Sequence, residues 1–154
     1  MAIGPLHLLR GLIKKEHIAK DEIQIEIPIV FFAGELSIAI DSTGVKYESG
    51  NYLISNELVK HLKKAYLEAA ITDFSATDAT VAVELYNVTD ASVVTSVSLS
   101  SDNYRARSSD IGDTIKGLVG KEVRARVNVT TASGTSGATA KVRAIKLILV
   151  LGIS

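Results

Sequence analysis

The sequence contains no cysteine and no tryptophan, and only one methionine, one glutamine and two prolines among its 154 residues. Without cysteine, neither a disulfide framework nor a thiolate metal site is available. The remaining aromatic residues, five tyrosines and three phenylalanines, offer little material for the ring platforms on which sugars stack. The scarcity of thermolabile side chains also favours a thermophilic source.

An excess of charge of one sign is also absent, because 17 lysines and arginines balance 17 aspartates and glutamates. Global charge therefore gives no argument for binding nucleic acid or membranes, and only local patches can. No window reaches the roughly 18 consecutive apolar residues of a membrane span. The N-terminus does not resemble a signal peptide, since His7, Arg10 and Gly11 interrupt its apolar stretch. Localisation stays open, and an extracellular filament or a virion is the favoured setting.

Motifs of catalysis are missing as well. The sequence contains no G-x-S-x-G, phosphate-binding loop or dinucleotide fingerprint. Its three histidines, His7, His17 and His61, do not form a pair at metal-ligand spacing, and residues 62–154 contain none. We therefore expect a protein that is not an enzyme, with no cofactor, no catalytic residue, no metal site and no identified small-molecule substrate.

Six aspartates leave one question about metals open. They fall in or beside predicted turns, where calcium finds its oxygen ligands, yet the spacing of a calcium-binding loop is absent and aspartate is an ordinary turn residue. The ordinary interpretation is favoured. These residues are Asp73, Asp78, Asp90, Asp102, Asp110 and Asp113.

The first distinct segment is amphipathic and basic. Residues 5–19 are predicted to form a helix whose apolar face holds Leu6, Leu9, Leu12 and Ile13. The cations of this region are Arg10, Lys14, Lys15 and Lys20. Such a helix can lie on an anionic membrane surface or face nucleic acid, and it can equally pack on its own domain.

In the next segment, 22–32, apolar and polar residues alternate as in a strand with one solvent-exposed face. Ile23, Ile25 and Ile27 alternate with polar residues, and after Pro28 the residues 29–32 are all apolar. Proline cannot donate to a sheet ladder, so Pro28 indicates an edge, a bulge or a change of partner. We interpret residues 1–33 as an arm of helix and strand, and residues 34–154 as a β-sandwich domain.

The sandwich is predicted from short strands separated by turns. We expect one short helix over 55–64, capped by Ser55, and a turn or helical piece over 111–119. Strands are expected over 36–40, 45–47, 66–74, 81–86, 93–99, 104–107, 123–129 and 140–151. The fold class is thus mainly β, with two antiparallel sheets.

Five motifs carry a resemblance to a known class of domain. They are Tyr66-Leu67-Glu68-Ala69, the run 83–89, Arg107-Ser108, the run 123–127 and Ala144-Ile145-Lys146-Leu147. In this order they resemble jelly-roll β-sandwiches, which occur as carbohydrate-binding-like modules and in virion or fibre proteins. The resemblance covers residues 65–150 and implies a fold rather than an activity.

The leading hypothesis is a non-enzymatic structural subunit of a homo-oligomeric filament or virion shell. Its arm would engage neighbouring copies by adding a strand to their sheets, with Ile23, Ile25, Ile27 and Ile29 as anchors beside the apolar face of the helix.

The alternative is a carbohydrate-binding module, with Tyr47, Tyr52 and Tyr104 as a modest aromatic platform. Two alternating arginine pairs give a further option, a basic stripe for phosphate or acidic glycans, although arginine alternating with apolar residues is also an ordinary wet sheet face. These arginines are Arg105, Arg107, Arg124 and Arg126.

Overall fold

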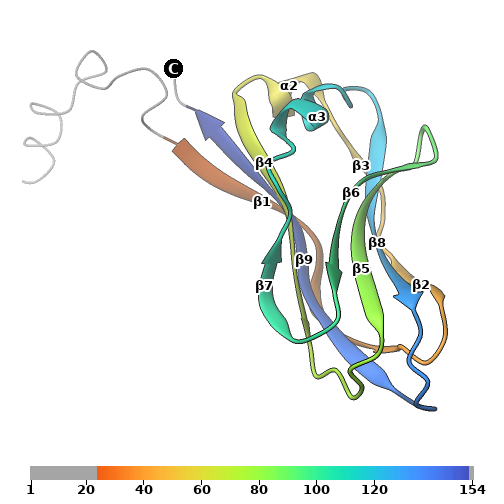
Figure 1. The fold of residues 1–154 in the computed structure, drawn as a ribbon. Helices are drawn as coiled ribbons and strands as arrows, with labels where there is room; N and C mark the ends of the chain where they lie inside the picture. Colours follow the sequence, from red (N-terminus) through yellow and green to blue (C-terminus); the bar gives the residue numbers. More distant parts are fainter. Residues whose placement is uncertain (1–23, 153–154) are drawn as a thin grey trace, which may run out of the picture.

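The computed structural model describes residues 24–152, and the predicted helix over 5–19 lies outside them. The described part contains nine strands and two short helices (Figure 1). In chain order these are β1 (Gln24–Ala39), β2 (Gly44–Glu48), β3 (Tyr52–Leu53), α2 (Asn56–Val59), β4 (Leu62–Thr72), β5 (Thr80–Asn87), β6 (Ser92–Leu99), β7 (Asn103–Arg107), α3 (Gly112–Lys116), β8 (Glu122–Thr131) and β9 (Thr139–Gly152).

The strands form two antiparallel sheets with the orders β1-β9-β4-β7 and β2-β8-β5-β6, and β3 extends the second sheet by pairing with β8. The strand pairs are nested: β1 pairs with β9, β2 and β3 pair with β8, β4 pairs with β7, and β5 pairs with β6. A ribbon of nested strand pairs rolled into two sheets is a jelly roll. The strand order confirms the predicted fold class and the jelly-roll resemblance.

The core lies between the two sheets and follows the period-2 alternation of the sequence. On β8, Val123, Ala125 and Val127 are fully buried, while Arg124 and Arg126 between them point to the outer face and are half-buried. Alternate residues of a strand face opposite sides of its sheet, so one face of β8 packs in the core and the other meets solvent.

One strand, β1, replaces the two strands predicted over 22–32 and 36–40. It pairs with β9 along its whole length, from Gln24 opposite Gly152 to Ala39 opposite Thr139. Two shifts of register absorb the irregular stretch before residue 35. The expected boundary between residues 33 and 34 therefore falls inside a strand that has the same partner on both sides.

The short helix begins as predicted and ends early. Ser55 caps it, because the backbone N–H of Leu58 donates to the Ser55 hydroxyl at 3.2 Å. The helix α2 ends at Val59, however, and β4 begins at Leu62, which is buried and pairs with Leu151. Lys63 and Lys64 were expected at the end of the helix, but they belong to β4. Burial of the strand in the sheet outweighs their helix propensity, because local propensity is a weak preference.

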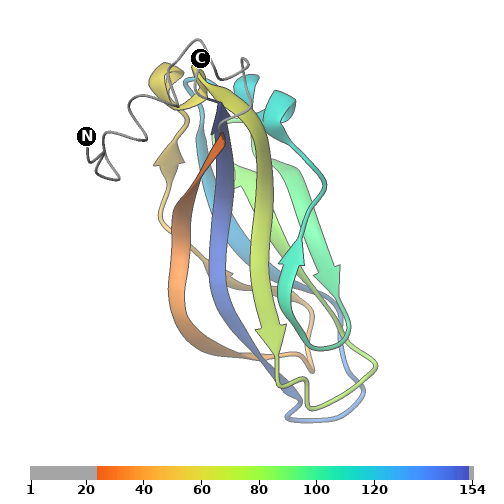
Figure 2. The ribbon, with the colours of Figure 1, turned by 90° about the vertical axis from the view of Figure 1, so that its left-hand side faces the viewer.

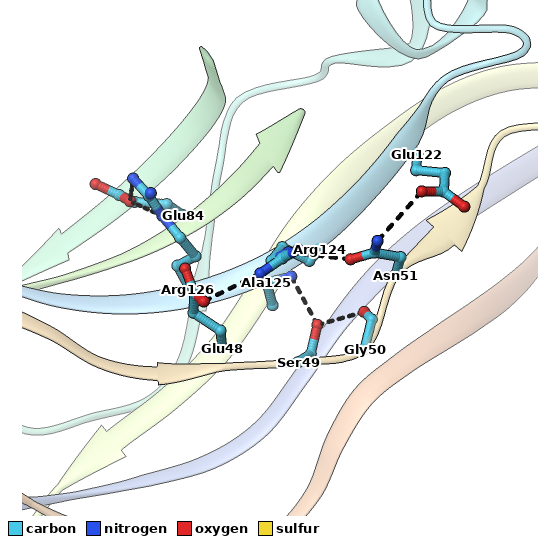
Figure 3. A network of polar contacts seen from close by, with 9 residues as sticks. All are labelled: Glu48, Ser49, Gly50, Asn51, Glu84, Glu122, Arg124, Ala125 and Arg126. Atoms are coloured by element: carbon cyan, nitrogen blue, oxygen red, sulfur yellow. Dashed lines mark hydrogen bonds and ion pairs between the residues drawn. The ribbon is translucent and has the colours of Figure 1, made fainter. Parts of the chain in front are cut away.

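Between β2 and β3 the chain leaves the ladder, and Ser49 holds it in place. The backbone N–H of Ser49 donates to the carbonyl of Ala125, and the Ser49 hydroxyl accepts from the backbone N–H of Ala125, both at 2.9 Å (Figure 3). The same hydroxyl donates to the carbonyl of Gly50 at 2.9 Å. The serine side chain thus supplies the acceptor that the interrupted strand lacks.

Replacing this hydroxyl should destabilise the sandwich. In Ser49→Ala the buried N–H of Ala125 loses its acceptor, which costs about 1–3 kcal/mol of unfolding free energy. Urea denaturation checks the value, with the exposed Ser98→Ala expected to stay within about 0.5 kcal/mol of the parent protein. Equal effects of the two substitutions would contradict the role of Ser49.

Candidate assembly surface

Three of the isoleucines predicted at an assembly interface lie on β1, and they pair within their own chain. Ile25 is opposite Leu151 and Ile27 is opposite Leu149 of β9, so the start of β1 completes the home sheet. The other predicted interface residues, Leu6, Leu9, Leu12, Ile13 and Ile23, lie outside the described part, as do the cations Arg10, Lys14, Lys15 and Lys20.

The start of β1 leaves part of its apolar face in solvent. Ile25 is 47% exposed and Ile27 is 42% exposed, although Leu149 beside them is fully buried in the core. Ile29 lies on the same face two residues further on, and it is half-buried and packs against the core. The core face of β1 therefore becomes uncovered toward Gln24, which is where the chain enters from residues 1–23.

The same end of the sandwich carries a second exposed apolar pair. Tyr52 is 37% exposed and Leu53 is 54% exposed, and together they form β3, which pairs with the first residues of β8. The start of β1, β3 and both helices lie at this end, which we call the helical end (Figures 1 and 2). The helical end thus exposes apolar side chains on strands of both sheets.

The open edge of β1 is poorly suited to accept a further strand at its start. The β1–β9 register runs through Pro28 without a shift, so the proline nitrogen faces away from β9 and toward the open edge. That edge offers no main-chain donor at Pro28. A contact at the start of β1 therefore depends on the isoleucine side chains more than on main-chain addition.

The two arginines of β7 are bound to a carboxylate of the same chain. On the outer face of the sheet containing β4, the Nε of Arg105 lies 3.2 Å and the Nη2 of Arg107 lies 2.7 Å from the Oε2 of Glu68. The Nζ of Lys146 lies 3.6 Å from its other oxygen. Burial raises the pKa of Glu68, but the hydrogen bonds from Arg107 and Arg105 outweigh it and hold the pKa below its ordinary value.

The arginines of β8, on the other sheet, also form ion pairs with carboxylates of the same chain. Figure 3 shows Arg126 bound to Glu84, with 2.7 Å between Nη2 and Oε2, and Arg124 bound to Glu48 at 3.0 Å. The Arg126 guanidinium also lies 3.8 Å from the centre of the Tyr86 ring. All four arginines thus serve internal ion pairs, which favours the ordinary interpretation of the predicted basic stripes.

The three tyrosines proposed as a carbohydrate platform do not share a surface. Tyr47 lies on β2 and packs against the Phe32 ring at 5.1 Å between centroids. Tyr104 lies on β7, at the opposite border of the sandwich. Three rings cannot stack on one sugar from separate borders, so this geometry does not favour the alternative function.

Five of the six turn aspartates accept hydrogen bonds from their own chain, and Asp113 lies 3.6 Å from the Nζ of Lys116. Asp110 accepts from the backbone N–H groups of Gly112 at 2.8 Å and Ala65 at 3.1 Å, and these bonds hold its pKa below the ordinary value. Within residues 24–152, no group of three histidine, cysteine, aspartate or glutamate residues is arranged to hold a metal ion. The described helices are also too short and polar to cross a membrane.

Comparison with known proteins yields little. No protein-family model and no curated protein matches the sequence. Among solved structures, the chain is similar to one in "Structure of infectious bursal disease virus Gx strain", with 11% sequence identity and a TM-score of 0.41. The match covers 87% of this chain and 33% of that one. A likeness this distant carries no conclusion about function.

Sequence reasoning missed the two buried glutamates that organise the outer faces. Glu68 is 5% exposed and Glu84 is 7% exposed, and each has apolar residues directly before and after it in its strand. A signal was present, since an acid inside such a strand needs a partner and the arginine pairs stood in two other strands. What the sequence did not show was which strands pair.

Removing the charge of Glu68 should destabilise the protein in a pH-dependent manner. Glu68→Gln leaves Arg105, Arg107 and Lys146 facing one another, at a cost of about 1–3 kcal/mol at neutral pH. Because the folded pKa of Glu68 is lowered, its stabilising contribution is full above the unfolded pKa of about 4.3 and is lost as the pH falls through the folded pKa.

The difference in unfolding free energy between parent and Glu68→Gln should thus be constant from about pH 6 to 8 and shrink below about pH 4. Urea denaturation across this range measures it. Glu122→Gln provides a control, since Glu122 is exposed. A difference that stays constant down to about pH 3 would contradict the assigned ion pairs.

Proposed function

We propose that this chain is a non-enzymatic structural subunit that associates with further copies of itself through the start of β1 and the arm that precedes it. The observation that carries the proposal is the exposure of Ile25 and Ile27 on a face that is otherwise core. A neighbouring copy that covers them continues the packing that Ile29 begins.

The magnitude of this burial shows how far the contact must extend. Covering two half-exposed isoleucines contributes about 2 kcal/mol, whereas association costs at least about 4 kcal/mol of lost translational and rotational freedom. The contact therefore has to include more apolar surface. Tyr52 and Leu53 supply some at the helical end, and the apolar residues predicted for the arm, from Leu6 to Ile23, supply the rest.

The non-enzymatic part of the proposal is supported by the state of the buried acids. Glu68 and Glu84 are each bound by arginine, and the hydrogen bonds from Arg107 and Arg105 lower the pKa of Glu68, so Glu68 stays ionised and is a poor proton donor at neutral pH. A filament or a virion shell is the form of assembly that we propose. The cations of the arm, Arg10, Lys14, Lys15 and Lys20, would then face an anionic membrane surface or nucleic acid.

Substituting the exposed isoleucines should abolish particles larger than a dimer and leave the fold intact. In Ile25→Thr/Ile27→Thr the strand preference is kept while the apolar contact is lost. We expect the parent protein to form particles larger than a dimer and the variant to form none, as measured by sedimentation velocity and electron microscopy. Its unfolding free energy should change by less than about 1 kcal/mol.

The matched control is Val45→Thr, because Val45 is also about half exposed, at 45%, and lies on a different edge strand. This control should assemble like the parent. Particles that persist in the double variant, or a parent protein that forms none, would contradict an assembly role for the start of β1.

A further inference from the structure

Within residues 24–152 the two sheets have four open edges, and three of them are well protected against pairing with another chain. The edge strand β1 has Pro28 and register shifts, β7 is five residues long and carries Arg105 and Arg107, and β2 is five residues long and carries Lys46 and Glu48. Prolines, charges, irregular register and short length are the usual means of keeping a sheet edge from pairing.

The fourth edge, β6, has only one of these protections, a register shift between Val93 and Thr95. It is eight residues long, with the sequence SVVTSVSL, and pairs with β5 on one side only. Residues 92–101 contain no charge, proline or glycine, in a chain whose charged residues make up 22%. Half of β6 is valine or threonine, the β-branched residues that favour strands. From Thr95 to Leu99 its pairing with β5 has no shift, and an uncharged edge of this kind is suited to strand pairing.

We infer that β6 pairs antiparallel with β6 of a second copy, joining the two sheets β2-β8-β5-β6 into one. Antiparallel pairing of identical strands has two-fold symmetry, so residues at the centre of the pair face themselves or a near neighbour of the other copy. A charge near the centre would therefore meet its own kind about 5 Å away. The uncharged run removes this repulsion, and the whole chain has a formal net charge of zero.

Side chains on and beside β6 provide the apolar surface for this contact. Val94, Val97 and Leu99 pack against the core but stay half-buried, since no strand of residues 24–152 pairs with the open side of β6. Val93 is 48% exposed. Tyr104 is 73% exposed, and its strand β7 borders the same side of the sandwich as β6 (Figure 2). Exposed tyrosines are enriched at protein interfaces.

This contact is separate from the surface proposed at the start of β1. Within their sheets, β6 and β1 lie at opposite borders of the sandwich. Each contact can therefore form without the other, and together they would let one copy bind two neighbours. The test is performed in the Ile25→Thr/Ile27→Thr background as well as in the parent protein, so that failure of one contact is not mistaken for failure of the other.

Charge substitutions at Ser98 test the inference. Ser98 is exposed and lies opposite Ala82 of β5, so a long charged side chain there has no carboxylate or amine directly across its own sheet. We expect the background protein to form a dimer. Ser98→Lys and Ser98→Glu should each weaken it at least tenfold in sedimentation equilibrium, and an equimolar mixture of the two should restore it.

Val45→Lys is the matched control, since Val45 lies on β2 at the opposite edge of the same sheet and is similarly exposed. It should leave the dimer unchanged. A background protein that stays monomeric at several hundred micromolar overturns the inference. So does a dimer that survives Ser98→Lys, or a mixture of the two charged variants that stays monomeric.

Cysteine substitution gives a direct geometric readout, because the chain has no cysteine of its own. Antiparallel partners near the two-fold axis lie within disulfide range, with Cα atoms about 4.5–5.5 Å apart. Under mild oxidation, Ser96→Cys or Ser98→Cys should give a disulfide-linked dimer at low protein concentration, and Val45→Cys should not. Equal cross-linking of all three variants, or of none, overturns the pairing of β6.

Discussion

The pairing of β1 with β9 is the interaction on which the rest of the structure depends. It joins the first described strand to the last along their full lengths, and it is the outermost of the nested pairs that make the jelly roll. Because these partners are more than a hundred residues apart at Gln24 and Gly152, the sheet closes only when the whole chain is in place. The same pairing puts Ile25 and Ile27 on the core face of the sheet, where their side chains stay partly exposed to solvent.

The outer faces are organised by a second constraint, the need of a buried acid for a partner. Glu68 and Glu84 sit on different sheets, and each is bound by arginine from a neighbouring strand. A buried carboxylate without such a partner would be costly, so each ion pair favours one strand alignment over others. We attribute to these pairs a role in fixing the register of the strands.

Much of the sandwich was predictable because its strands alternate cleanly. The inward residues of β8 and the Ser55 cap follow from local patterns, and both are confirmed. The continuity of β1 was not predictable, because Pro28 and Gly34 are breaking signals that the pairing with β9 overrides. The early start of β4 at Leu62 has the same cause, since burial against a distant strand decided it.

The candidate surfaces were predictable only in part, for a related reason. The sequence singled out Ile25 and Ile27 by their alternation, but only the strand order shows that they lie at the uncovered end of a completed sheet. Nothing in the run 92–101 identified β6 as an edge. Whether a strand is central or at an edge is decided by its neighbours, which a local pattern does not contain.

The register of β1 against β9 has one more consequence. Gln24 lies opposite Gly152, so the chain enters and leaves the sandwich side by side at the helical end (Figure 1). The turns that join β4 to β5 and β8 to β9 lie at the far end (Figure 1). The two ends of the described chain thus share one pole of the sandwich, and the opposite pole is made of turns alone.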